Sequence, residues 1–312
     1  MPSDHETHPF IRLGTRRSPL AMAQAIETQK RLCAAHDWPP EAVELVPVEA
    51  SGDKIQDRPL AEIGGKALWT RELDVWLAEG RIDVSVHSMK DVETLRPAGL
   101  TIAAILPRAD KRDVLVGATT LANLPKGATI GTSAPRRAAQ ALNARPDFNI
   151  VMFRGNVATR LGKLAEGEAD ATFLAKAGLD RLGEDGVGTP LAMEDWLPAP
   201  AQGAIGLECR TGDKRVKNLL AAIDHPPSYA EIRAERAVLA ALGGTCHSPI
   251  AMLARFDAGE IHVRCVLYSP DGVERAESSA TLKADDNQGL AIFAAELLGK
   301  AAPSIKSVFI TV

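Results

Sequence analysis

The chain has 312 residues, of which 46% are hydrophobic and 24% charged, a composition typical of a folded globular protein with about two domains. No apolar run approaches the ~20 residues that span a bilayer, and the first ten residues lack the basic and apolar regions of a secretory signal. The sequence therefore favours a cytoplasmic protein and excludes a membrane partner.

The cysteine and histidine content gives no sign of a metal site. Cys33, Cys209, Cys246 and Cys265 are far apart and form no C-x-x-C pair, and the seven histidines show no ligand spacing. We therefore expect neither a bound metal nor a disulfide framework.

The formal net charge of −4 is unevenly distributed along the chain. Between residues 126 and 165 there are seven basic residues and one acid, Asp147. The basic residues are Lys126, Arg136, Arg137, Arg145, Arg154, Arg160 and Lys163. Such a local excess of positive charge predicts a site for an anion. Nucleic acid is disfavoured because aromatic residues make up only 4% of the chain, too few to suggest a stacking platform.

Near the N-terminus, a strand is expected at residues 10–13 and a helix from Pro19 to about Ala35. Serine at the N-cap followed by proline at the first helical position is a strong helix-start signal, and here it is Ser18 and Pro19. The free N–H groups at such a helix start favour an anion, which makes Arg16 and Arg17 candidate ligand contacts.

A second candidate site follows the strand expected at residues 82–86. Before it, residues 44–49 favour a strand, Gly64-Gly65-Lys66 a loop, and apolar positions from Trp69 onward a helix that ends at Gly80. The strand at 82–86 runs directly into His87, Ser88, Lys90 and Asp91. Ligands bind beyond the carboxyl ends of strands in open α/β sheets. Asp91 would place a carboxylate in a cleft lined by arginines, and a carboxylate in such surroundings indicates a group that acts on a cation or a proton.

The middle of the chain repeats this plan. A strand at 128–131 leads into Thr132, Ser133 and a helix containing Arg136 and Arg137, as the first strand leads into Arg16. Strands at 149–153 and 170–174 continue the repeat, and Arg154 to Arg160 opens another helix. Two similar α/β lobes with a shared cleft are the simplest interpretation.

The last third has a different pattern. The Pro/Gly-rich stretch 197–203 predicts a hinge or a crossover between lobes, and 204–209 predicts a strand. Ser228 and Glu231 form a capping-box pattern that predicts the start of the next helix. Strands at 250–256, 260–268 and 273–282 and a helix at 289–298 then indicate a small α+β domain.

A thiol on the loop before this domain is the candidate attachment point for chemistry. Cys246 lies between Gly243-Gly244 and Pro249, and no apolar neighbour from 243 to 248 would bury its sulfur. Its loop position predicts that it faces a ligand.

Five strings together carry a family resemblance. They are Val86-His87-Ser88-Met89-Lys90-Asp91; Gly131-Thr132-Ser133 with Arg136-Arg137; Arg154-Gly155-Asn156-Val157 with Thr159-Arg160-Leu161; Gln202-Gly203-Ala204 with Glu208-Cys209-Arg210; and Gly244-Thr245-Cys246 with Pro249-Ile250. In this order, from about Ile11 to the C-terminus, the chain resembles the porphobilinogen deaminase family, also called hydroxymethylbilane synthase. It departs from the family at Glu93-Thr94, where proline is common, and at Thr245, where glycine is frequent.

The resemblance implies a fold of two periplasmic-binding-protein-like (transferrin-like) mixed-sheet lobes plus a C-terminal α+β domain with a three-stranded antiparallel sheet. Residues 1–106 and 204–221 would form lobe 1, residues 107–200 lobe 2, and residues 226–312 the C-terminal domain. It implies a monomeric transferase of tetrapyrrole biosynthesis that joins four porphobilinogen molecules, releases ammonia and makes hydroxymethylbilane. The primer is a dipyrromethane cofactor held by a thioether to Cys246.

The resemblance also implies site roles. Asp91 is expected to hydrogen-bond pyrrole N–H groups, stabilise a cationic intermediate and move protons. Arginine forks suit the acetate and propionate groups of cofactor and substrate. The expected binding residues are Arg16, Ser18, Lys66, His87, Ser88, Lys90, Thr132, Ser133, Arg136, Arg137, Arg154, Gly155, Asn156, Arg160, Arg181 and Gln202.

Two other classes were weighed against this one. A two-lobed binding protein for a small polycarboxylate anion would explain the cleft but not Cys246. A ligand-sensing regulator would need a nucleic-acid-reading element, and the sequence has no basic helix-turn-helix pattern. A colour test for pyrroles after addition of porphobilinogen separates the three.

Overall fold

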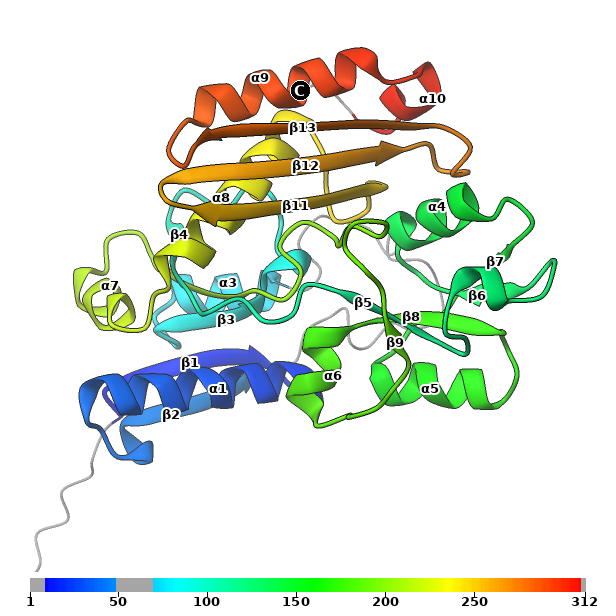
Figure 1. Cartoon of the computed structure of the whole chain (residues 1–312). Coiled ribbons are helices and arrows are strands. Elements are labelled where there is room, and N and C mark those ends of the chain that lie inside the picture. The colour runs from blue at the N-terminus through cyan, green and yellow to red at the C-terminus, as the bar shows by residue number, and fades with distance from the viewer. Residues whose placement is uncertain (1–8, 49–69, 310–312) are drawn as a thin grey trace, which may run out of the picture.

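The computed structural model describes residues 9–48 and 70–309, which form two five-stranded mixed sheets and one three-stranded antiparallel sheet (Figure 1). The first sheet has the order β2 (Val43–Val48), β1 (Ile11–Arg16), β3 (Val84–Ser88), β10 (Ile205–Arg210) and β4 (Leu100–Ile105). The second has the order β7 (Asn149–Val151), β6 (Thr129–Gly131), β8 (Ala171–Ala175), β5 (Asp113–Val116) and β9 (Thr189–Pro190).

The two sheets have the same topology, which confirms the prediction of similar lobes. In each, the second strand of the order (β1 or β6) pairs in parallel with both neighbours, and the fourth strand (β10 or β5) runs antiparallel to the central strand (β3 or β8). Strand β10 joins the first sheet only after the chain has built the second one. The stretch 197–203 therefore is the predicted crossover.

Helices follow the strands in both lobes. They are α1 (Pro19–His36), α3 (Arg71–Ala78), α4 (Pro135–Ala144), α5 (Val157–Ala165), α6 (Lys176–Leu182) and α7 (Lys214–Ala221), with short 3-10 turns η1 (Pro40–Ala42), η2 (Met89–Asp91) and η3 (Leu121–Asn123). Ser18 caps α1 as predicted, since its side chain accepts a hydrogen bond from the Ala21 N–H. Helices α1 and α6 come from different lobes and pack side by side (Figure 1).

The C-terminal domain packs helices on one face of its sheet, above both lobes in Figure 1. Its strands are β11 (Ile250–Asp257), β12 (Glu260–Tyr268) and β13 (Arg275–Lys283), and its helices are α8 (Pro226–Ala241), α9 (Asn287–Lys300) and α10 (Pro303–Lys306). Val238, Met252 and Leu290 lie fully buried in its core. Apolar burial of this kind is the main source of stability for such a layer.

The predicted capping box at the start of α8 is wrong. The N-cap is His225, whose Nδ1 accepts from the Ser228 N–H, and Ser228 itself lies within the helix. Glu231 is not available to cap because it pairs with Arg108 and Lys111. Long-range charge pairing outweighs the local capping pattern here.

None of the helices in the described part of the chain is both long and apolar enough to span a bilayer. Within residues 9–48 and 70–309, no group of three or more histidine, cysteine, aspartate or glutamate side chains is arranged to hold a metal ion.

Candidate active site

Lys90 and Asp91 lie where the end of β3 meets lobe 2. Both belong to the 3-10 turn η2, directly after the strand. Burial lowers the pKa of Lys90. The nearby negative charge of Asp91 acts in the opposite direction, whereas the positive charges of Arg137 and Arg160 in lobe 2 lower this pKa further. The polar ends of the two lobes therefore share one electrostatic environment, as the sequence predicted.

Arg160, on the first turns of α5, faces the same place. Its pKa is lowered to about 10, first by burial and then by the positive charge of Arg137, while Asp91 acts in the opposite direction. Its Nε donates to the carbonyl of Gly155 at 3.1 Å, and its two Nη groups make no hydrogen bond to residues 9–48 or 70–309. Burial and the neighbouring positive charge of Arg137 both disfavour the charged guanidinium, and bound carboxylates would offset that penalty.

Cys246 is exposed, as predicted, and its thiol lies near the acids of lobe 1. The surrounding protein atoms, and then the negative charges of Asp91 and Glu93, raise its pKa to about 11. The thiol is therefore almost fully protonated at neutral pH. A reaction that uses this sulfur as a nucleophile needs a group to take its proton.

A buried carboxylate that no local sequence pattern predicts organises the lobe 2 side. Asp113, the first residue of β5, is fully buried and accepts hydrogen bonds from Arg136 Nη1 (2.6 Å) and Arg137 Nη2 (2.7 Å). It also accepts from Trp196 Nε1 (2.8 Å) and Gln202 Nε2 (2.9 Å). Burial alone would raise the pKa of Asp113, but the two arginines outweigh burial and hold it far below its usual range.

Arg136 and Arg137 are consequently less available to a ligand than predicted. Both are only 5% exposed, and Arg136 also donates to Gln140 and to the carbonyl of Leu197, while Arg137 donates to the carbonyl of Phe173. The Nε atom of each is buried without a hydrogen-bond partner in the described part of the chain. Gln202, another predicted contact, is likewise bound by donating to Asp113. We call this group of side chains, which comprises Asp113, Arg136, Arg137, Trp196 and Gln202, the Asp113 cluster.

Several other predicted contacts have protein partners of their own. His87 Nε2 lies 3.0 Å from Glu208 Oε2, and Ser88 exchanges hydrogen bonds with Gln24. Arg181 Nε lies 3.2 Å from Glu27 Oε2 on α1, so it links the two lobes. These side chains are therefore bound to other groups of the protein.

The remaining predicted contacts occupy loop and helix-start positions. Thr132 Oγ1 accepts from the Ala134 N–H ahead of α4, and Asn156 caps α5 through the Thr159 N–H. Gly155 has φ of 107°, a backbone conformation that favours glycine. Ser133, Arg16 and Arg154 are half-buried at the same strand ends, whereas Lys66 lies outside the described residues.

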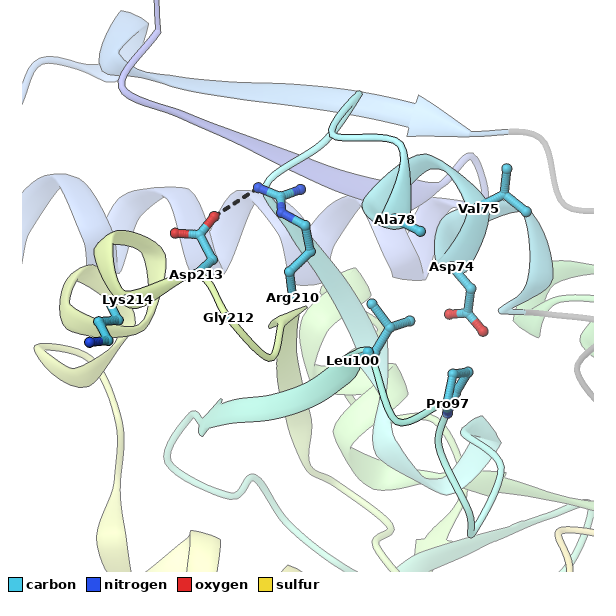
Figure 2. Close-up of a pocket in the computed structure, with 10 residues that line it drawn as sticks. Asp74, Val75, Ala78, Pro97, Leu100, Arg210, Gly212, Asp213 and Lys214 are labelled. Carbon is cyan, nitrogen blue, oxygen red and sulfur yellow. Dashed lines mark hydrogen bonds and ion pairs between the residues drawn. The ribbon is translucent and has the colours of Figure 1, made fainter.

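A pocket of about 890 Å³ lies elsewhere, at the far end of β10 (Figure 2). Arg210 and Asp213 form an ion pair on one side of it, and Pro97 and Leu100 line the other. None of the predicted site residues lines it. The start of β10 pairs with Ser88, so the pocket and the cleft are separated by the length of this strand, roughly 17 Å.

The fold and these residues together define a class of protein: a two-lobed α/β protein in which Lys90 and Arg160 lie within electrostatic reach of Asp91, and Asp91 within reach of the Cys246 thiol. Matches to known families agree with this class. The model of the porphobilinogen deaminase dipyrromethane cofactor binding domain matches residues 11–218, and the model of the porphobilinogen deaminase C-terminal domain matches residues 229–302.

Similar proteins place the chain in one family. A porphobilinogen deaminase from Sphingopyxis alaskensis is 52% identical over 307 residues, which are 96% of this chain and 97% of that protein. Among solved structures, the periplasmic VFT2 domain of Bordetella pertussis BvgS covers 68% of this chain and 86% of its own at 13% identity, with a TM-score of 0.40. A periplasmic substrate-binding protein of an ABC transporter from Coxiella burnetii covers 70% and 94% at 16% identity, with a TM-score of 0.41. The chain belongs to the porphobilinogen deaminase family.

Proposed function

We propose that the cleft around Lys90, Asp91, Arg160 and Cys246 is where this chain performs the reaction of its family. The chain is a transferase of tetrapyrrole biosynthesis that joins four porphobilinogen molecules head to tail, releases ammonia and gives hydroxymethylbilane. The observation that supports this placement best is that Asp91 lies within electrostatic reach of Lys90 and Arg160 on one side and of the exposed Cys246 thiol on the other. A binding protein for a small polycarboxylate anion is not favoured.

The dipyrromethane cofactor fits the donor set of the cleft. Lys90 and Arg160 lie within electrostatic reach of each other and of Asp91, and Arg154 adds positive charge near Arg160. The positive charge of this group favours an anionic ligand. The cofactor brings carboxylates and, when bound, supplies the pyrrole carbon to which the first substrate unit is joined. Arg16, Ser18, Ser133, Asn156 and the predicted Lys66 would add donors at the strand ends.

Arg136 and Arg137 act mainly through the Asp113 cluster in this proposal. Their hydrogen bonds fix the start of α4 against β5 and the crossover that contains Gln202. The lobe 2 wall of the cleft is thereby held in place, with each Nε left as a donor. Thr132, Gly155, His87, Ser88 and Arg181 shape the remaining walls in the same indirect way.

Asp91 acts on the proton and the positive charge of the reaction. Loss of ammonia leaves an electron-deficient methylene group on the substrate pyrrole, and arginines would repel that cation. A carboxylate at this point stabilises it, accepts hydrogen bonds from pyrrole N–H groups and takes up the proton released when the new C–C bond forms.

Cys246 forms the thioether once and then holds the primer. Because its thiol pKa is about 11, a base must accept the S–H proton during attachment, and Asp91 or Glu93 lies close enough to influence that thiol. After the bond forms, the sulfur carries no charge and the same acids no longer oppose it.

We also propose the domain limits, location and assembly stated above. Lobe 1 then comprises residues 1–106 and 204–221, lobe 2 residues 107–200, and the C-terminal domain residues 226–312. The three separate sheets and their strand order support these limits. The protein acts as a cytoplasmic monomer without a nucleic-acid partner.

The Asp91→Ala variant tests the proposed role of the acid. We expect it to fold and to keep its cofactor, measured by intact mass, while turnover in the pyrrole colour test falls to near zero. Turnover close to that of the unaltered protein would remove Asp91 from the mechanism.

A further inference from the structure

The segment after Asp91 is held by an arginine of another domain. Arg236, on α8, donates to three consecutive backbone carbonyls: Val92 (3.3 Å), Glu93 (2.6 Å) and Thr94 (3.0 Å). No carboxylate is among its hydrogen-bond partners in the described part of the chain, so its donors serve this backbone. Only a guanidinium fork offers several N–H donors in one plane, which makes lysine a poor substitute.

The same segment also contacts the loop of Cys246. Thr94 Oγ1 donates to the carbonyl of Gly244 at 3.0 Å, two residues before the cysteine. Val92 and Met89 pack in one apolar cluster with Ile232 of α8. The segment 89–96 is thus joined to the C-terminal domain on both sides of Glu93.

Lobe 1 anchors this segment independently through Arg96. Its guanidinium binds Glu208 through Nε and Nη2, both at 2.8 Å, and binds Glu93 and Asp74. Glu93 in turn accepts from Thr70 Oγ1. The segment therefore has two attachments, one inside lobe 1 through Arg96 and one to the C-terminal domain through Arg236.

We infer that Arg236 and Thr94 are positioning residues that set the distance between the Asp91 carboxylate and the primer held on Cys246. The inference rests on the proposed roles of Asp91 and Cys246. The acid belongs to lobe 1 and the sulfur to the loop that follows α8, so relative movement of the two domains would separate them. Arg236 and Thr94 make the hydrogen bonds that cross this boundary directly beside both groups. A misplacement of about 1 Å can lower a rate by about a hundredfold.

The test compares Arg236→Met, Arg236→Lys and Thr94→Val with a matched control, Arg233→Met. Arg233 lies one turn earlier on α8, is also half-buried, and donates to the carbonyl of Ala284 within its own domain. For each cofactor-loaded protein, kcat, KM, the thermal unfolding midpoint and the intact mass are measured. Hydrogen–deuterium exchange reports on residues 89–96 and 244–248.

We expect Arg236→Met to lower kcat by about tenfold or more, with KM within about twofold and the primer mass retained. Arg236→Lys should fall between this variant and the unaltered protein, and Thr94→Val should lower kcat by about threefold. Exchange should quicken in both segments for Arg236→Met and in neither for Arg233→Met, whose kcat should stay within about twofold.

Three outcomes would overturn the inference. They are a kcat within about twofold for both Arg236→Met and Thr94→Val, an equal loss of kcat in Arg233→Met, and an effect confined to KM. If Arg236→Met does not fold, Thr94→Val decides the matter alone, because it keeps the shape of the side chain. If one of these outcomes is found and the Asp91→Ala variant is inactive, only the positioning role is refuted. If the Asp91→Ala variant is active, the proposed role of the acid itself is refuted.

Discussion

Replacing Asp113 with asparagine tests whether one buried carboxylate holds the lobe 2 wall of the cleft. Asparagine keeps the shape of the side chain and one acceptor oxygen but removes the charge that faces Arg136 and Arg137. Both guanidiniums are 5% exposed, so water cannot replace the lost partner. Removing one partner of a buried ion pair typically costs about 3–5 kcal/mol. Whole proteins are stable by only about 5–15 kcal/mol, so we expect a large loss of stability.

The assay is urea-induced unfolding at neutral pH, followed by circular dichroism. We expect Asp113→Asn to reduce the free energy of unfolding by about 4 kcal/mol, which is close to a thousandfold in the unfolding equilibrium. Asp147→Asn is the matched control in the same lobe, because Asp147 pairs with Arg145 at the surface, and we expect little change. A loss below about 1 kcal/mol for Asp113→Asn would refute the reasoning.

Other predictions concern the arginines and a buried glutamate. Arg160→Ala should keep the primer yet lower kcat/KM by about 10- to 100-fold, the usual effect of losing a charged hydrogen bond. Arg136→Ala, in contrast, should block primer assembly. If intact-mass experiments show that both variants stall at the same stage, separate roles for the two arginines are contradicted. Burial would raise the pKa of Glu208, but hydrogen bonds from His87 and Arg96 lower it to about 2. The charged Glu208 therefore stabilises the folded protein fully above about pH 4.3, the pKa of an unfolded glutamate, and this stabilisation is lost as the pH falls toward 2. Glu208→Gln should therefore be less stable than the unaltered protein at pH 7 in urea unfolding, by a difference that narrows below about pH 4.3 and disappears near pH 2. A difference that stays constant with pH would contradict this assignment.

Local signals in the sequence predicted much of the fold. Ser18 followed by Pro19 predicted the start of α1, and the repeated strand-to-arginine pattern predicted the twin lobes. The glycines before Cys246 predicted an exposed thiol. These features depend on residues within a few positions of one another, where capping and turn rules apply.

The features that the sequence did not predict depend on distant partners. Asp113 follows Lys111-Arg112 and looks like part of a solvated charge run, yet its partners include Trp196, 83 residues away. Arg136 and Arg160 look alike in the sequence, but only the first meets a buried carboxylate. Burial and long-range pairing therefore decide which arginines are held by other protein groups, and the sequence pattern alone does not show either.

The intact mass of the purified protein tests the central claim most directly. We predict that the unaltered protein carries an excess mass matching two linked pyrrole units and that Cys246→Ser does not. An unmodified mass in active protein, or the same excess in Cys246→Ser, would contradict the account.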